Sequence, residues 1–323
     1  MTKKKIICLG LMISAIIVNC VTPVFAQYPT NDNVEIYSST LQEEEEGNGT
    51  TDQYKVVIKS LTDGSVSESS VIAEMNESSA EVEMTEPEIG TGDTVESSAS
   101  TFGIVGEDER VRVTNTKSVP YRYIAYLRCK WPNGDTTIGS AFMIGKYTAA
   151  TAGHCVFDSS RGGYPDDIAV WPGMNTSSII PYSGSHVNKI YLPKLYKTKK
   201  NNNYDAAVIK INSPLGQKTG YMGLRKQSGS YNGINMYVSG YPADHYQQQW
   251  KMKSRIIKTG NYRLIYKIDT MGGQSGSPIF RLYDDKWYAI GIHTTGYYSN
   301  GECVQNGGVK FHSAIYAMMK KYK

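Results

Sequence analysis

Three residues that could cooperate in nucleophilic catalysis occur in the order His154, Asp205 and Ser275, separated by 51 and 70 positions. A serine hydroxyl is a weak nucleophile at neutral pH, so it needs a neighbouring base, and that base needs an acid to fix its tautomer and stabilise its charged form. Ser275 stands in a glycine-rich run from Asp269 to Pro278, in which the backbone can approach a ligand closely and aim its N–H groups inward. This combination predicts a serine nucleophile with a histidine base.

Each of these residues adjoins a segment with the composition of a β-strand. The run 151–155, Thr-Ala-Gly-His-Cys, follows an apolar strand, 203–209 places its acid at the mouth of another, and Ser275 lies between the β-type runs 263–268 and 278–283. We expect further strands near 121–127, 139–144, 167–171, 206–211, 234–240, 254–259 and 287–293. The single helix expected is 313–322, whose apolar residues fall on one face. The pattern predicts an all-β fold of two barrels or sandwiches with a C-terminal helix.

The first 26 residues have the composition of a secretory signal peptide. Three lysines at positions 3 to 5 precede an apolar run, and Val24-Phe25-Ala26 offers a cleavage site before Gln27. The apolar run is too short for an ordinary membrane span, and no later stretch is long enough. We therefore expect a secreted, extracellular protein with no membrane association once the signal is removed.

Residues 27–102 differ sharply in charge from the rest of the chain. They carry 17 acidic residues and two lysines, whereas 103–323 carries 29 basic and 13 acidic residues. Their composition cannot bury a large core alone, so we expect a largely disordered segment with one β-like patch at 54–60. It is either a spacer or a propeptide that covers the basic domain as its intramolecular partner, and different parts could do each. The basic residues of 103–323 are scattered, which does not favour a nucleic-acid partner.

The cysteines bear on disulfides and metals. Cys8 and Cys20 leave with the signal peptide, so Cys129, Cys155 and Cys303 remain, and their odd number leaves at least one unpaired within the chain. We expect a disulfide from Cys155 to either of the other two, because exported proteins can keep such bonds. No C-x-x-C or H-x-x-x-H spacing and no EF-hand loop occurs. We therefore expect no cofactor and no structural metal site, with calcium binding left open.

The region from about 103 to 323 resembles the chymotrypsin-fold serine proteases of the bacterial glutamyl endopeptidase group, the V8-like type. The resemblance is carried, in family order, by Arg112-Val113-Thr114-Asn115-Thr116, Thr-Ala-Gly-His-Cys at 151–155, Asn-Tyr-Asp at 203–205, Ser239-Gly240-Tyr241-Pro242, Gly-Gly-Gln-Ser-Gly-Ser-Pro at 272–278, and Gly291-Ile292-His293-Thr294-Thr295-Gly296. It implies two six-stranded antiparallel β-barrels with a C-terminal helix. It also implies three parts of the chain: signal peptide 1–26, acidic propeptide 27–102 and protease domain 103–323.

The resemblance assigns catalytic roles residue by residue. Ser275 would be the nucleophile, His154 the general base and then acid, and Asp205 the residue that orients His154. The backbone N–H groups of Gly273 and Ser275 would form the oxyanion hole. The segment from Thr294 to Gly296 would pair with the substrate backbone as an added strand.

Thr270 and His293 occupy the positions that line the primary specificity pocket in this fold. Taken singly, Thr270 would be a strand-edge residue and His293 a core histidine. Together, in a strongly basic domain, a hydroxyl and an imidazole favour recognition of a carboxylate. The resemblance therefore implies a monomeric endopeptidase whose substrates carry Glu, or less readily Asp, before the cut. A trypsin-like pocket would need an acid here, and Asp269 stands one residue away.

Three points stay open at this level. The family uses the mature α-amino group in the pocket, and processing after Glu96 and processing near Phe102 to Ile104 both fit the sequence. Relatives with a disulfide beside the catalytic histidine place its partner where this chain has Gly139. The alternatives to a Glu-specific enzyme are a protease of different or gated specificity, as in exfoliative-toxin relatives, and a non-catalytic secreted binding module on the same fold. The remaining loop acids and histidines are expected to be structural: Asp158, Asp166, Asp167, Asp244, His186, His245 and His312.

Overall fold

The structure is a computed structural model that describes residues 51–74, 82–85, 96–97, 104–299 and 302–323. The predicted signal peptide lies outside these residues. Within the described residues, no helix is both long and apolar enough to cross a membrane.

Six antiparallel strands close the first barrel. In ring order they are β6 (Ile124–Lys130), β7 (Thr136–Gly145), β8 (Thr148–Thr151), β11 (Ala207–Ile211), β10 (Ser185–Pro193) and β9 (Asp167–Pro172), and β9 pairs back onto β6. Alternating side chains point into the barrel, so Ile124, Phe142 and Val208 are fully buried.

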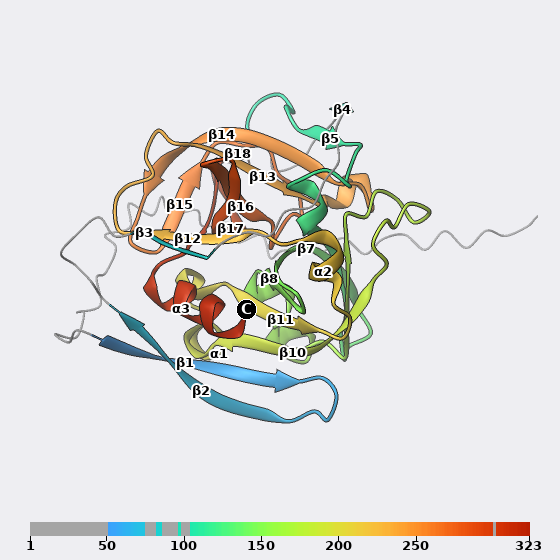
Figure 1. The fold of residues 1–323 in the computed structure, drawn as a ribbon, viewed down its shortest axis with the longest axis vertical. Helices are drawn as coiled ribbons and strands as arrows, with labels where there is room; N and C mark the ends of the chain where they lie inside the picture. Colours follow the sequence, from blue (N-terminus) through green and yellow to red (C-terminus); the bar gives the residue numbers. More distant parts are fainter. Residues whose placement is uncertain (1–50, 75–81, 86–95, 98–103, 300–301) are drawn as a thin grey trace, which may run out of the picture. The chain divides into compact units, whose positions relative to one another are not determined.

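The second barrel is closed in the same way. Its ring consists of β13 (Asn235–Gly240), β16 (Pro278–Tyr283), β17 (Lys286–Ser299), β18 (Glu302–Lys310), β15 (Arg263–Tyr266) and β14 (Trp250–Thr259), and β14 pairs with β13. A short strand, β12 (Gly223–Gln227), runs parallel to β17, and β5 (Val111–Val113) pairs with β14. The two six-stranded barrels expected from the resemblance are confirmed (Figure 1).

The C-terminal helix is confirmed at its expected bounds. This helix, α3 (Ser313–Tyr322), buries Ile315, Met318 and Met319, and Tyr322 stacks on Tyr191 of β10 with ring centroids 4.1 Å apart. Two shorter helices, α1 (Lys194–Lys199) and α2 (Leu215–Thr219), were not expected. The nine expected strands are present, and β8 is the apolar strand expected before the run 151–155, although β5, β10, β12 and β18 were missed.

Three parts of the acidic segment are described: residues 51–74, 82–85 and 96–97. The expected patch at 54–60 lies in β1 (Thr51–Ser60), which forms a hairpin with β2 (Val66–Glu74). This hairpin extends the first sheet because β1 pairs with β10 (Figure 1). Two shorter strands follow: β3 (Val82–Thr85) pairs with β12, and β4 (Glu96–Ser97) pairs with β5.

The expected disulfide is not formed, because Cys129, Cys155 and Cys303 are all buried free thiols. The Cys129 thiol donates to the carbonyl oxygen of Cys155 at 3.1 Å, so it faces the backbone of Cys155. The sulfur of Cys155 faces Gly139 instead, where an added Cβ would lie 3.0 Å from it. The family's bridging position is therefore next to Cys155 but carries no sulfur.

Candidate active site

His154 and Asp205 meet at the ends of two neighbouring strands. His154 lies in a 3₁₀ turn directly after β8, Asp205 directly precedes Ala206 and β11, and β8 pairs with β11. The Asp205 carboxylate lies 2.8 Å from His154 Nδ1 and accepts the His154 backbone N–H at 2.9 Å. At Gly153 an added Cβ would approach the Tyr196 ring to 2.9 Å, so a side chain there would disturb this pair. Asp205 therefore bonds both the ring and the backbone of His154.

The electrostatics of this pair suit a base. Burial alone would lower the pKa of His154, but the neighbouring Asp205 carboxylate raises it well above 6.5. Asp205 is itself buried. A protonated imidazole beside a fixed carboxylate is stabilised, which is what general-base catalysis requires of the residue that takes up the proton.

Ser275 lies in a turn whose backbone only glycine can adopt without strain. Gly273 and Gly276 have φ values of +95° and +89°. An added Cβ at Gly276 would lie 2.0 Å from the carbonyl oxygen of Ser140. The buried side chain of Gln274 accepts the Met271 backbone N–H at 2.9 Å and so braces the turn from within.

Ser140 of β7 attaches this turn to the first barrel. Its backbone N–H donates to the Ser275 carbonyl at 2.8 Å, and its hydroxyl donates to the Gly273 carbonyl at 2.9 Å. The same hydroxyl accepts the Tyr241 backbone N–H at 2.8 Å. Sequence reasoning missed Ser140, because a single serine in an apolar strand carries no signal of a partner in the other barrel.

The contacts of Ser275 join its turn to the residue that follows His154 and leave two backbone donors of the turn without an acceptor among the described residues. The thiol of Cys155, the residue after His154, donates to the Ser275 carbonyl at 3.5 Å. In the described part of the chain, no hydrogen bond links the His154 ring to the Ser275 hydroxyl; such bonds often tighten only when substrate binds. Nor does any described residue accept from the backbone N–H of Gly273 or Ser275. These two N–H groups are therefore available to an incoming oxygen.

Thr270 and His293 are both buried, and each is oriented by a second residue. The Thr270 hydroxyl donates to Asn306 Oδ1 at 2.9 Å, and the Asn306 amide donates to the Ile268 carbonyl at 2.6 Å. His293 Nδ1 lies 2.9 Å from the Tyr266 hydroxyl. Neither Tyr266 nor Asn306 was expected from the sequence.

The Tyr266 contact fixes the protonation of His293. Burial, together with the positive charges of His154 and Arg263, lowers the pKa of His293 to about 3, so its ring is neutral at neutral pH. Burial also raises the pKa of Tyr266 well above 10, so the phenol keeps its proton, and no other acceptor for it exists among the described residues. The phenol therefore donates to Nδ1. His293 in turn carries its own proton on Nε2, which makes that nitrogen a donor.

Asp269 does not present its carboxylate to the pocket. It is 2% exposed and accepts the backbone N–H groups of Val105 and Glu109 at 2.7 and 2.8 Å. The carboxylate thus anchors the chain at Val105 and Glu109, ahead of β5, and it directly precedes Thr270 in the sequence. An acid held in this way is a poor partner for a basic substrate side chain.

The segment from Thr294 to Gly296 offers a free strand edge. β16 pairs with β17 only as far as Ile292, so beyond that point β16 leaves this edge of β17 unpaired. Arg263 braces the segment by donating to the hydroxyls of Thr294 at 3.0 Å and Thr295 at 2.8 Å. Its second terminal nitrogen, Nη1, donates to the carbonyl of Asn202, in the loop before Asp205, at 2.6 Å.

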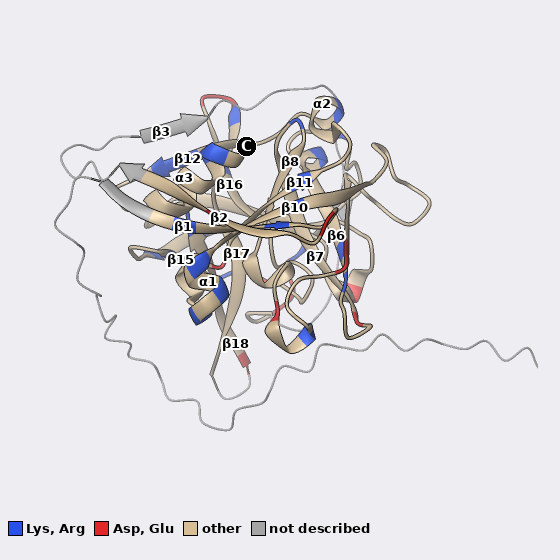
Figure 2. Ribbon diagram, turned by 90° about the horizontal axis from the view of Figure 1, so that it is seen from below, with Lys and Arg blue, Asp and Glu red and all other residues tan. Residues whose placement is uncertain are grey.

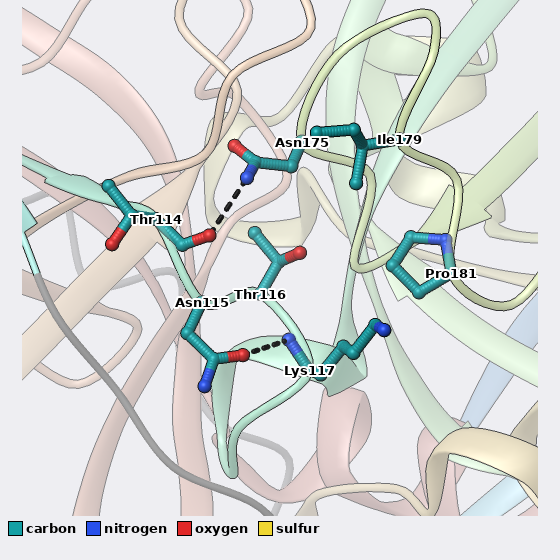
Figure 3. A pocket seen from close by; sticks show the side chains of 7 residues that line it. All are labelled: Thr114, Asn115, Thr116, Lys117, Asn175, Ile179 and Pro181. Atoms are coloured by element: carbon teal, nitrogen blue, oxygen red, sulfur yellow. Dashed lines mark hydrogen bonds between the residues drawn. The ribbon is translucent and has the colours of Figure 1, made fainter.

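Several of the acids and histidines expected to be structural have structural partners. Asp244 pairs with buried Arg110 at 2.6 Å, Asp158 caps a 3₁₀ turn, and His312 Nε2 lies 3.1 Å from the Asn203 carbonyl. No cluster of three or more His, Cys, Asp or Glu side chains suited to a metal occurs in the described ranges. A cavity of about 310 Å³ lies elsewhere and includes no predicted site residue (Figure 3); its lining is Thr114, Asn115, Thr116, Lys117, Asn175, Ile179 and Pro181.

Two closed barrels, a histidine–carboxylate pair on the first and a glycine-rich serine turn on the second define the chymotrypsin-like class of serine proteases. Comparison with known families agrees, since residues 111–317 match the trypsin family. The chain belongs to the trypsin family of serine proteases.

Known relatives point to one group within this family. The chain is 34% identical over 228 residues to a glutamyl endopeptidase of Bacillus licheniformis, covering 68% of this chain and 69% of that protein. It is 39% identical over 197 residues to an extracellular metalloprotease of Bacillus subtilis, covering 60% of this chain but only 62% of the relative's length. A solved structure of a Glu endopeptidase in complex with MPD superposes with a TM-score of 0.60 at 31% identity, covering 68% of this chain and 98% of that one. The protein is thus a serine protease homologous to glutamyl endopeptidases.

Proposed function

We propose that this protein is a secreted serine endopeptidase that cleaves after Glu, and less readily after Asp, through an acyl-enzyme intermediate. The observation that carries the proposal is that Thr270 and His293 are both buried and oriented by a second residue, and that the His293 carbonyl accepts the Gly276 N–H of a serine turn whose Gly273 and Ser275 N–H donors are free. The names of the Bacillus licheniformis relative and of the solved Glu endopeptidase support the same specificity.

The proposed chemistry uses side chains and backbone alone. The Ser275 hydroxyl attacks the substrate carbonyl carbon while His154 takes its proton, and Asp205 stabilises the resulting imidazolium. The N–H groups of Gly273 and Ser275 hold the oxyanion, at about 3 kcal/mol for each donor. The C–N bond then breaks as His154 returns its proton to the leaving amine. Water, deprotonated by the same imidazole, hydrolyses the acyl-enzyme.

Specificity for a carboxylate follows from the donors that the pocket can offer. The neutral His293 ring presents an Nε2–H, and a second donor becomes available if the Thr270 hydroxyl turns away from Asn306. The strand edge at Thr294 to Gly296 would hold the substrate backbone. A pocket selecting Lys or Arg would need a free acid, and Asp269, which directly precedes Thr270, is committed to two backbone N–H groups.

The anchor at Asp269 also bears on the mature N-terminus. Because Val105 is held beside Thr270, a terminus created near Phe102 to Ile104 would begin close to the pocket. A terminus created after Glu96 would begin in β4, which is paired with β5. The first site supports a role for the new α-amino group in binding the substrate carboxylate, so we favour it.

Export and processing complete the proposal. The pattern of residues 1–26 supports a signal peptide, and the word extracellular in the name of the Bacillus subtilis relative supports secretion. Residues 27–102 would be a propeptide that delays activity and contacts the basic domain 103–323 within the same chain. The mature enzyme is proposed to act as a monomer.

Paired peptides that differ only in the residue before the cut test the specificity. Faster hydrolysis after Glu than after Lys or Phe is expected, and the reverse order would refute the claim. Failure on small Glu substrates alongside cleavage of one particular protein would favour the gated alternative. In the purified Ser275→Ala variant turnover should vanish while the circular dichroism spectrum stays unchanged; persisting activity would rule out Ser275 as the nucleophile.

The name of the Bacillus subtilis relative raises metal-dependent proteolysis as a second candidate. A serine protease and a metalloprotease are expected to respond oppositely to two inhibitors. A serine-directed phosphonate should label Ser275 and abolish activity, and EDTA should leave activity unchanged. Full inhibition by EDTA without labelling by the phosphonate would favour the metalloprotease reading, and a chain that shows neither activity nor labelling would favour the binding module.

A further inference from the structure

The hairpin of β1 and β2, residues 51–74, lies on a surface formed by β10, α1 and α3 (Figure 1). β1 continues the first sheet antiparallel to β10, with Val56 opposite Pro193 and Ser60 opposite Lys189. Beyond the strand, the Leu61 backbone N–H donates to the Asn188 carbonyl at 2.8 Å. Strand addition of this kind provides affinity through main-chain hydrogen bonds. We call these residues the N-terminal hairpin.

The N-terminal hairpin is also packed into the apolar core of the first barrel. Val56 and Val71, from its two strands, are 2% and 3% exposed and belong to the same buried cluster as Ile315 and Met318 of α3. In contrast, Ile72, the neighbour of Val71 in β2, is 64% exposed. The acidic segment cannot form a core of its own, so this contact explains how part of it becomes ordered.

Polar contacts fix the N-terminal hairpin on the same surface. Glu68 pairs with Lys194 of α1 at 2.8 Å, and Lys321 of α3 donates to the Ser69 hydroxyl at 3.0 Å and the Ser70 carbonyl at 2.8 Å. Figure 2 shows the basic residues of α1 in this region. These groups are exposed, so their attraction weakens as salt is added.

The N-terminal hairpin touches the loop that supplies Asp205. The ring of Tyr54 lies 6.4 Å from that of Tyr204, the residue directly before Asp205. Tyr204 also packs edge-on against His312 at 5.2 Å, and His312 Nε2 meets the carbonyl of Asn203 in the same loop. No described contact joins the N-terminal hairpin to Ser275 or His154. The hairpin therefore supports the acid of the site without covering the nucleophile.

We propose that the N-terminal hairpin is a docked strand partner of the first barrel that stays bound after the chain is cut behind it, and that it holds the Asp205 loop in place. This inference concerns the N-terminal hairpin alone, so the delaying role proposed for residues 27–102 would belong to the parts of that segment outside 51–74. The supporting role rests on the proposed function, whereas docking itself requires no catalysis. It commits the surface of β10, α1 and α3 to one occupant, residues 51–74 of the same protein. Loss of that occupant opens the β10 edge and the apolar face of α3.

The test uses the full chain carrying Ser275→Ala, with a recognition site for an unrelated sequence-specific protease placed between residues 75 and 81. After cutting, size-exclusion chromatography is run at roughly 0.15 M salt. We expect the fragment with the hairpin to co-elute with the remainder, and the thermal midpoint of the complex to fall on dilution, because binding follows mass action. Since this chain is inactive by design, failure of the proposed Glu specificity would not affect the result.

Two matched variants locate the contact. Val71→Asp places a charge in the buried interface and should weaken binding at least tenfold, whereas Ile72→Asp, one residue along, should leave it unchanged. If Val71→Asp does not fold, Glu68→Lys, which sets like charges against Lys194, should weaken binding most at low salt. Separation of the unaltered fragment to the same extent as the Val71→Asp fragment would overturn docking.

A second measurement tests support of the Asp205 loop. In the active chain cut at the same place, release of the N-terminal hairpin by dilution should lower kcat and leave KM nearly unchanged. Addition of the separated fragment should restore kcat. A rise in kcat on release would overturn the supporting role and show that the hairpin inhibits.

Discussion

A cysteine introduced at position 139 should form a disulfide with Cys155, beside the candidate active site. An added Cβ at Gly139 would lie 3.0 Å from the Cys155 sulfur, 3.4 Å from Leu127 and 3.5 Å from the Ser275 carbonyl. Gly139 does not have a positive φ, so a side chain is compatible with its backbone. In Gly139→Cys the new sulfur therefore points at an existing free thiol across the interface of β7 and the turn after β8.

The size of the effect follows from the loop that the bond would close. Positions 139 and 155 enclose a loop of roughly 17 residues, for which restriction of the unfolded chain contributes about 3 kcal/mol. For a domain of this size that corresponds to a rise in Tm of about 6 to 12 °C. In the reduced variant the Cβ only crowds the Cys155 sulfur, so the reduced protein should be less stable than the unaltered one.

Differential scanning calorimetry of the oxidised and reduced Gly139→Cys protein measures the effect, and peptide mapping identifies the linkage. Gly139→Ala is the matched control, since it adds the same Cβ without a sulfur and should lower Tm under both conditions. The reasoning is refuted if the oxidised variant shows no 139–155 linkage, or if its Tm does not exceed that of the reduced form. A linkage from Cys155 to Cys129 instead would show that the Cys155 sulfur can turn away from Gly139.

Three further changes test individual contacts. Tyr266→Phe removes the donor that fixes the tautomer of His293, so KM for Glu peptides should rise up to about tenfold with kcat little changed; a change in kcat alone would contradict this. Burial lowers the pKa of His312 to about 4, so the unfolded chain binds more protons than the folded one as pH falls from 6.5 toward 4, and His312 alone costs about 2 kcal/mol of stability between pH 7 and pH 5. Urea unfolding should show a pH dependence smaller by about that amount in His312→Gln, while the part due to His293 stays in both proteins. Asp205→Asn should lower kcat about 10⁴-fold with the fold intact, and a loss below tenfold would exclude its proposed role.

The strands that could be predicted from the sequence are those whose own residues show the alternation of apolar and polar side chains typical of a strand. β16 and β17 alternate around apolar residues; β16 was expected at its observed bounds, whereas β17 was expected only as far as His293 and continues to Ser299. β18 was missed because it contains Gly307 and Gly308, which weaken any strand pattern. The need for glycine at position 308 is visible only once β18 is paired with β17, because an added Cβ there would lie 2.0 Å from the Ile292 carbonyl oxygen of β17.

The acidic segment shows the limit of composition as a guide. Its composition indicates that it cannot fold alone, and nothing in the structure contradicts that. Val56 and Val71 are buried because β10 and α3 supply the rest of their core, more than 100 residues further along the chain. Composition indicates only whether a segment can fold by itself. The hairpin of β1 and β2 is ordered by its contacts with β10 and α3, which lie outside the acidic segment.

The same limit explains which site residues could be anticipated. The proposed triad stands in local motifs, so its members could be named before the fold was known. The residues that hold the site act across the chain: the hydroxyl of Ser140 bonds a carbonyl 133 positions away, and Asp269 binds N–H groups 164 and 160 positions away. No local pattern encodes such partners.

Asp269 shows why those distant partners matter for function. From the sequence, an acid next to Thr270 would argue for a pocket that accepts Lys or Arg. In the structure its charge is held by the N–H groups of Val105 and Glu109, and the other pocket groups offer a neutral N–H donor at His293 and the nearby positive charge of Arg263. Under the proposed specificity the carboxylate would act on the substrate indirectly, by fixing the chain at Val105 and Glu109 beside the proposed pocket. The same residue thus argues for a basic substrate when its partners are unknown and for an acidic one when they are known.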